Sequence, residues 1–275
     1  MVRPVSVGFD GSAESLAAAA WAGREAVLRG VPLRVVHVLQ MQTGAARPAP
    51  GTSAEREWAE SRLEVAQEQL TEAHPGLQVG VDRVTEPPVR ALVDAARDAE
   101  VLVLGSRELG TVQGFLLGPV SLAVATHAPR PVVVVHEPPA GQANGGGAVV
   151  LGLGPARPYD PLLAFAFDAA AARGAVLRIV QVTDGEPAAG EPEPRGGSAL
   201  AEVLRPWRER MPAVEVDEWL TTGSAAQHLL EAAGQAALLV VGRREHRHPL
   251  GVGLGPVAHA ALHHAPCPVA VVPLG

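Results

Sequence analysis

The sequence of 275 residues contains no lysine, and all 22 of its basic residues are arginines. The absence of lysine excludes a P-loop, which holds phosphate through a lysine, and any enzyme that forms a Schiff base through a lysine amine. The 29 acidic residues give a formal net charge of −7. Because a nucleic-acid-binding surface concentrates positive charge, this balance argues against a nucleic-acid partner.

Cysteine is scarce as well, since Cys267 stands alone. A lone cysteine cannot form an internal disulfide, which favours a reducing, cytoplasmic compartment, and we interpret Cys267 as a small packing residue. Aromatic residues make up 3% of the chain, so the core must be built from Ala, Val and Leu. The chain also lacks a signal-peptide pattern and an uncharged apolar run of about 20 residues, so we expect no membrane segment.

What the sequence does contain is a repeat. Residues 101–135 read VLVLGSRELGTVQGFLLGPVSLAVATHAPRPVVVV, and residues 238–272 read LLVVGRREHRHPLGVGLGPVAHAALHHAPCPVAVV. Both segments run from an apolar strand through a glycine loop and an Ala-rich helix to a valine-rich strand, with equal spacing. Such self-similarity indicates two copies of one folding unit. We predict a first domain over residues 1–136, a linker over 137–147 and a second domain over 148–275.

Each copy alternates strands with helices, which predicts an α/β fold with a parallel sheet covered on both faces. The first copy has expected strands at 5–9, 33–39, 79–84, 101–104 and 132–136, expected helices at 13–29, 54–73, 88–98 and 120–126, and a long loop at 40–53. The second has strands at 148–153, 176–182, 214–220, 238–241 and 269–272, helices at 159–173, 198–210, 225–234 and 257–263, and a loop at 184–197.

A ligand of an open parallel sheet binds beyond the carboxyl ends of the strands, where the strand order reverses. The loops that reach this place follow the first and the fourth strand of each copy. The loop after the fourth strand runs from Gly105 to Gly118 in the first copy and from Gly242 to Gly255 in the second. A glycine loop that leads into a helix can hold a phosphate, because its backbone amides and the helix dipole face the anion.

Four sequence blocks make the pattern specific: VGFDGS at the start, VVHVL in the second strand, VLVLGSR leading to GFLLG, and HAPRPVVVV or HAPCPVAVV at the end of each copy. With these blocks the chain resembles a tandem universal stress protein of the UspA family, over essentially its whole length. The resemblance implies two Rossmann-like (HUP-type) domains, each a five-stranded parallel sheet of order 3-2-1-4-5. It also implies a stress-response sensor or adaptor that binds ATP or another adenine nucleotide.

The resemblance also implies site residues. Asp10 would contact the nucleoside, and the backbone of Val38 would face the adenine. The candidate set of the first domain is Asp10, Gly11, Ser12, Val38, Gly105, Arg107, Gly114, Gly118, Val120 and Ser121. The corresponding set of the second domain, which departs further from the family pattern, is Gly154, Val182, Gly242, Arg244, Gly251, Gly255 and Val257.

Both copies depart from the family's ATP-binding pattern of Gly-x2-Gly-x9-Gly followed by Ser or Thr. Glu108 and Glu245 replace the middle glycine, and Pro119 and Pro256 replace the hydroxyl residue. A glutamate brings negative charge towards the phosphates, and a proline lacks both the hydroxyl and a backbone N–H. A structural turn that has lost its ligand is therefore the alternative for both loops. It is favoured further in the second copy, where Gly154 replaces the acidic residue.

The sequence shows no catalytic residues, so we expect at most slow ATP hydrolysis. Several histidines gather in the second copy, but no acidic or cysteine partner stands at a metal-ligand spacing, and we expect no metal site. The rival to nucleotide binding is a module that acts through an unidentified protein partner. A homodimer of the tandem chain also stays open.

Overall fold

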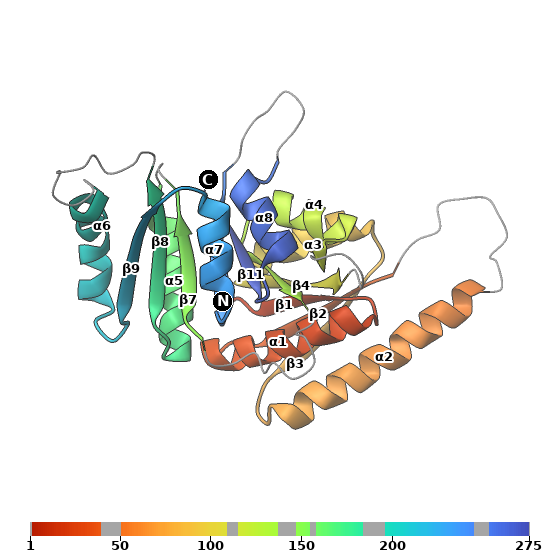
Figure 1. The fold of residues 1–275 in the computed structure, drawn as a ribbon. Coiled ribbons are helices and arrows are strands. Elements are labelled where there is room, and N and C mark those ends of the chain that lie inside the picture. Colours follow the sequence, from red (N-terminus) through yellow and green to blue (C-terminus); the bar gives the residue numbers. More distant parts are fainter. Residues whose placement is uncertain are drawn as a thin grey trace. The chain divides into compact units, whose positions relative to one another are not determined.

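The computed structural model describes residues 2–39, 51–108, 115–136, 147–154, 158–183, 196–244 and 253–274. The chain divides into two compact units, Met1–Glu137 and Pro138–Gly275. Strands and helices alternate along the chain in each unit (Figure 1).

Unit 1 contains a parallel sheet of five strands: β1 (Val5–Phe9), β2 (Leu33–Val38), β3 (Val79–Val84), β4 (Val101–Glu108) and β6 (Val132–His136). Their spatial order is β3-β2-β1-β4-β6, which confirms the predicted order 3-2-1-4-5. In the register, Val5 of the central strand lies opposite Leu33 on one side and Val101 on the other. The order reverses between β1 and β4, so a ligand is expected where these two strands end.

Helices cover both faces of this sheet, as the sequence predicts (Figure 1). Helices α1 (Ala13–Arg29) and α2 (Gly51–Ala73) pack together on one face, and α3 (Pro88–Asp98) and α4 (Pro119–His127) pack together on the other. Helix α1 begins after Ser12, whose side chain accepts a hydrogen bond from the Ser15 amide. It ends at Gly30, which has a φ of 65° that favours glycine.

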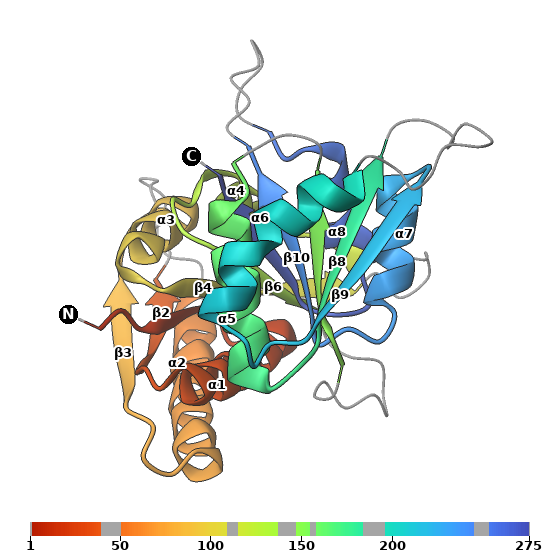
Figure 2. The same cartoon turned by 90° about the vertical axis from the view of Figure 1, so that its left-hand side faces the viewer.

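Unit 2 repeats the arrangement with strands β7 (Val149–Leu153), β8 (Leu177–Thr183), β9 (Val216–Thr222), β10 (Leu238–Arg243) and β11 (Val269–Pro273) in the order β9-β8-β7-β10-β11. Helices α5 (Asp160–Arg173) and α6 (Gly196–Arg210) cover one face, where Phe167 stacks on Trp207 with ring centroids 5.7 Å apart. Helices α7 (Ala225–Ala233) and α8 (Pro256–His264) cover the other face (Figure 2).

Small aliphatic side chains make up most of the core, as the scarcity of aromatic residues requires. All five residues of β6 are buried, which fits a strand covered on both faces. Cys267 is 4% exposed, which confirms its interpretation as a packing residue. Among the described residues, none of the helices has both the length and the hydropathy that a membrane span requires.

The element boundaries correct the sequence analysis at several places. Helices α2 and α6 begin at Gly51 and Gly196, inside the segments predicted as loops. Strand β4 continues to Glu108, and β5 (Phe115–Leu116) pairs antiparallel with this extension. Such a pairing depends on tertiary contact, because two residues carry no periodicity of their own. Most of the predicted linker, residues 137–146, lies outside the described residues.

Candidate functional site

Unit 1 has a cavity of about 420 Å³ at the carboxyl ends of β1, β2 and β4. It lies beside the point where the strand order reverses, which is the general ligand position for this fold. The described residues that line it are Gly8, Phe9, Asp10, Ser12, Glu14, Ser15, Val38, Pro88, Leu92, Leu104, Gly105, Gly118, Pro119, Val120 and Ser121. The structure therefore gathers residues from four separated segments that the sequence analysis had assigned to one site.

A tight turn between β1 and α1 positions Asp10. Its Oδ1 accepts hydrogen bonds from the Ser12 amide at 3.0 Å and from the Ser12 hydroxyl at 2.6 Å. Between them, Gly11 has a φ of 83°, a conformation that favours glycine. Gly11 thus shapes the turn but does not itself line the cavity. Because one Asp10 oxygen holds the turn, the carboxylate is fixed at the rim of the cavity.

Gly105 brings β4 close to the first turn of α1. A Cβ built on Gly105 would lie 2.5 Å from the backbone oxygen of Glu14, a distance that real Cβ atoms essentially never show. The strand and the helix can approach this closely only because the residue is glycine. The approach places the Glu14 side chain at the cavity, so the described lining contains two acidic residues, Asp10 and Glu14.

The N-terminus of α4 closes the cavity on another side. Gly118 is its N-cap residue, no side chain caps this helix end, and Pro119 occupies the first turn. The Ser121 hydroxyl donates a hydrogen bond to the Gly105 carbonyl oxygen at 3.1 Å, which ties the helix to β4. Since the first amides of a helix have no intrahelical partner, those of Val120 and Ser121 can face an anion in the cavity.

Two predicted site residues of unit 1, Arg107 and Gly114, are not tested at this cavity. The backbone of Arg107 pairs with Leu116 in the extension of β4, as that of Glu108 does with Phe115. The side chain of Arg107 lies outside what the structure describes, so its role at the cavity stays a prediction. Gly114 lies outside the described residues.

Some lining residues, from α3 and from the first turn of α1, were not predicted from the sequence. Pro88 and Leu92 of α3 face the cavity, as does Glu14 of α1. Pro88 and Leu92 are one helical turn apart and so share a face, a signal that was present in the sequence. Which face of α3 meets the cavity is decided by packing on the sheet.

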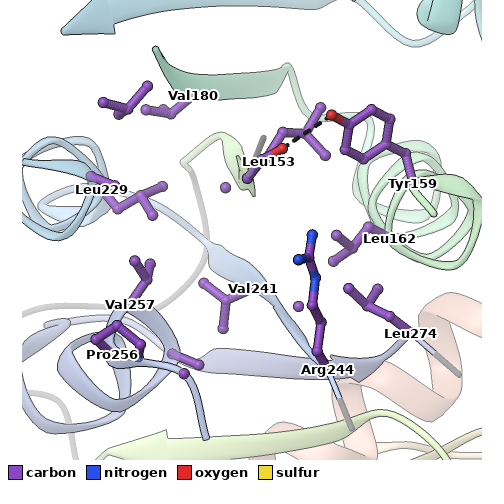
Figure 3. Close-up of a pocket in the computed structure, with 17 residues that line it drawn as sticks. Leu153, Tyr159, Leu162, Val180, Leu229, Val241, Arg244, Pro256, Val257 and Leu274 are labelled. Atoms are coloured by element: carbon purple, nitrogen blue, oxygen red, sulfur yellow. Dashed lines mark hydrogen bonds between the residues drawn. The ribbon is translucent and has the colours of Figure 1, made fainter. Parts of the chain in front are cut away.

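Unit 2 has a cavity in the corresponding place, with a volume of about 280 Å³ (Figure 3). Its described lining consists of Gly152, Leu153, Gly154, Tyr159, Leu162, Val180, Val182, Ala225, Leu229, Val241, Gly242, Arg244, Gly255, Pro256, Val257, Ala258 and Leu274. The predicted residues Gly154, Val182, Gly242, Arg244, Gly255 and Val257 are thus brought together. The other two sequence positions of interest here, Glu245 and Gly251, lie outside the described residues.

The two cavities differ in chemistry. In unit 1 the described lining includes Asp10, Glu14 and three serines, whereas aliphatic side chains dominate in unit 2. Arg244 is the only charged residue among the described residues that line the second cavity. The hydroxyl of Tyr159 donates a hydrogen bond to the Gly154 carbonyl oxygen at 3.1 Å, drawn as the dashed line in Figure 3.

The histidines of α8 form a chain of rings on that helix. The ring centroids of His259 and His263 are 4.4 Å apart, and those of His263 and His264 are 6.3 Å apart. Partial desolvation and the two neighbouring imidazoles lower the pKa of His259. Within the described part of the chain, no three His, Cys, Asp or Glu side chains are arranged to hold a metal ion.

Known proteins match this chain in both of its units. The sequence profile of the universal stress protein family matches residues 1–136 and again residues 149–273. The chain belongs to the universal stress protein family. A universal stress protein of Mycolicibacterium smegmatis is 35% identical over 283 aligned residues, which cover 98% of this chain and 96% of that protein.

Solved universal stress proteins agree with the fold. The crystal structure of one from Archaeoglobus fulgidus covers 98% of both chains with a TM-score of 0.73 and 21% sequence identity. A universal stress protein whose structure was solved in complex with cAMP covers 49% of this chain and 97% of its own, with 28% identity and a TM-score of 0.38. The two matches of the family profile, at residues 1–136 and 149–273, show the tandem arrangement of universal stress protein domains in this chain.

Proposed function

We propose that unit 1 binds an adenine nucleotide, with ATP as the candidate ligand, and that the protein acts as a stress-response sensor or adaptor without efficient catalysis. One observation carries the proposal. The cavity of unit 1 is lined jointly by Asp10, Val38, Gly105 and Gly118, which stand far apart in the sequence and which the family resemblance assigns to nucleotide binding.

The nucleoside end of the ligand would lie against Asp10 and Val38. A carboxylate is an acceptor of hydrogen bonds, so Asp10 suits the hydroxyl groups of a ribose. The pairing of β2 with β1 ends at His37, and Val38 is the next residue. The backbone of Val38 therefore lies at the end of the sheet, beside the cavity. Its amide and carbonyl groups suit the flat, polar edge of a base.

The phosphate end would lie at α4 rather than at α1. The first turn of α1 is already capped by Ser12, whose hydroxyl accepts from the Ser15 amide at 3.2 Å, and the neighbouring carboxylate of Asp10 repels an anion. The N-terminus of α4 has no side-chain cap. Its amides and the positive end of its dipole favour negative charge, which assigns the phosphate to Val120 and Ser121.

Isothermal titration calorimetry of the intact protein with ATP, ADP and AMP tests the proposal. We expect binding, and we expect Asp10→Ala to weaken it about ten- to a hundredfold, because a hydrogen bond to a charged group contributes roughly 1.5–3 kcal/mol. Asp10→Asn keeps an acceptor for the turn but removes the charge, so it separates the two roles of the carboxylate. Asp98→Ala, at the exposed end of α3, is the matched control.

Two outcomes of the titration would contradict the proposal. Absence of heat with all three nucleotides at millimolar concentration would contradict nucleotide binding. An equal loss of affinity in Asp10→Ala and Asp98→Ala would contradict the placement of the nucleoside.

The second candidate function, a module that acts through a protein partner, is favoured by Pro119, since a proline at the cavity removes one backbone donor.

A further inference from the structure

The cavity of unit 2 is walled by aliphatic side chains from both the sheet and its covering helices. Val180, Val241 and Leu153 come from the strands, and Leu162 and Leu229 come from α5 and α7. Figure 3 shows these side chains converging on one space. Leu153, Leu162 and Leu229 are at most 4% exposed, so the walls belong to the buried core of the unit. Such walls favour an apolar ligand.

Among the described residues that line this cavity, Arg244 is the one with a charged side chain. Arg244 directly follows β10, and Figure 3 shows its guanidinium extending into the cavity beside Leu162. An arginine side chain stays protonated in proteins and presents a planar set of donors. That geometry matches the two oxygens of a carboxylate, which it can bind through two parallel hydrogen bonds. Described walls that are mainly aliphatic, with the guanidinium of Arg244 among them, therefore suit an apolar molecule that carries an anionic group.

The described walls of this cavity offer a nucleoside fewer hydrogen-bonding side chains than those of unit 1 do. Gly154 stands where unit 1 has Asp10, and because glycine has no side chain this position offers a ribose no carboxylate. The Tyr159 hydroxyl already donates to the Gly154 carbonyl oxygen at 3.1 Å. In unit 1, by contrast, Asp10 and Ser12 both line the cavity. A ribose placed in unit 2 would lose hydrogen bonds to water without regaining them from these walls, which costs free energy.

We propose that unit 2 binds a small, mainly apolar molecule with one carboxylate, which pairs with Arg244 while its hydrocarbon part fills the aliphatic cavity. The volume of about 280 Å³ lies just below the range of roughly 300–1,000 Å³ for small-molecule sites, so the ligand is small. The uncapped N-terminus of α8, whose Pro256 and Val257 line the cavity, adds positive potential on the same side of the sheet ends.

Methyl NMR of the intact protein, with labelled leucine and valine, tests the proposal with octanoate, octanol and octylammonium as probes. We expect octanoate to shift the methyl signals of Leu153, Leu162 and Leu229 and to bind at least tenfold more tightly than octanol. Octylammonium should bind most weakly, because it brings a second cation beside Arg244. Octanol binding as tightly as octanoate would overturn the assignment of the carboxylate, and octanoate leaving these methyl signals unmoved would overturn the site.

Two pairs of variants locate the effect. Arg244→Gln should bring the affinity for octanoate down to that for octanol, whereas Arg205→Gln, on the exposed face of α6, should change neither. Val257→Phe fills the second cavity and should abolish octanoate binding, while Val120→Phe, its counterpart in unit 1, should not. If Arg244→Gln fails to fold, the order of affinity of the three probes for the wild-type protein still tests whether a carboxylate is preferred. Nucleotide binding to unit 1 is followed through the methyl signals of Leu92 and Leu104. The proposal for unit 2 and the proposed nucleotide site can therefore be refuted independently.

Discussion

Gly105 and Gly242 occupy equivalent positions in the two units but meet different neighbours. A Cβ on Gly105 would lie 2.5 Å from the backbone oxygen of Glu14. A Cβ on Gly242 would meet the ends of two leucine side chains, Leu274 at 3.0 Å and Leu162 at 3.1 Å. Side-chain ends can turn away, whereas the first turn of α1 cannot move without disturbing its cap. Glycine is therefore required at Gly105 for the close approach of two backbone segments, whereas at Gly242 it only eases the packing of two side chains.

We expect Gly105→Ala to lower the free energy of unfolding by about 1–3 kcal/mol, the usual range for overpacking a core. Gly242→Ala should cost clearly less, because the leucines can rearrange. Urea denaturation followed by circular dichroism measures both variants. Equal destabilisation by the two substitutions would show that the contact between β4 and α1 is not the constraint.

Cys267 provides a second residue-scale prediction. It is 4% exposed, and burial raises the pKa of its thiol to about 12. Because the thiolate is the nucleophile and a raised pKa keeps the thiol protonated, native protein at pH 8 should not react with a disulfide reagent within an hour. The denatured chain should release one equivalent, since it has one cysteine. Rapid reaction of the native protein would mean that the entrance to β11 opens readily.

The site residues that could be found from the sequence are those in fixed motifs. Asp10 follows a strand, and Gly105 and Gly118 bound a glycine loop, so their positions along the sheet edge follow from strand order alone. Glu14 and Leu92 were not found, because only the packing of helices on the sheet decides which of their faces meets the cavity. The sequence also identified Arg244 as a candidate, but only the structure surrounds it with aliphatic walls.

Helix α4 shows how a single element can keep its fold while its binding capacity changes. Proline suits the first turn of a helix, since its fixed φ is already helical and the missing N–H has no helical partner there. Pro119 therefore supports α4 while it removes a donor and a hydroxyl from the cavity. Pro256 has the same place in α8.

We expect Pro119→Ser to raise the affinity of the protein for ATP about five- to tenfold, since serine restores a backbone donor and a hydroxyl group at the end of α4. Pro256→Ser is the matched control and should leave ATP affinity unchanged, because unit 2 lacks an equivalent of Asp10. Calorimetric titration of both variants gives the comparison. Unchanged ATP affinity in Pro119→Ser would contradict the placement of the phosphate at α4.

At the scale of elements, the sequence predicted the strands and helices that carry a clear periodicity or cap. Helix α1 was bounded correctly at Arg29 because Gly30 ends it. The antiparallel strand β5 was missed, because its two residues form a strand only through pairing with the end of β4. The starts of α2 and α6 were placed late, since Gly51 and Gly196 are poor helix formers that pattern reasoning assigns to a loop.

At the scale of the molecule, the repeat preserves the fold more closely than the site. Both units have the same strand order, and both have a cavity where the order reverses. The walls that define the ligand have diverged, with Asp10 and serines in unit 1 and aliphatic side chains around Arg244 in unit 2. A duplicated fold with two different cavities suits a protein that responds to two kinds of small molecule.

This divergence predicts the stoichiometry of nucleotide binding. We expect the intact protein to bind one adenine nucleotide per chain, because Gly154 offers no carboxylate at the position that Asp10 occupies in unit 1. Native mass spectrometry in the presence of excess ATP counts the bound molecules, and Asp10→Ala should lose the single adduct. Octanoate added together with ATP should give a second, independent adduct. Two equal nucleotide sites, both retained in Asp10→Ala, would mean that the acidic residue does not distinguish the units and that the difference in wall chemistry has no consequence for the ligand.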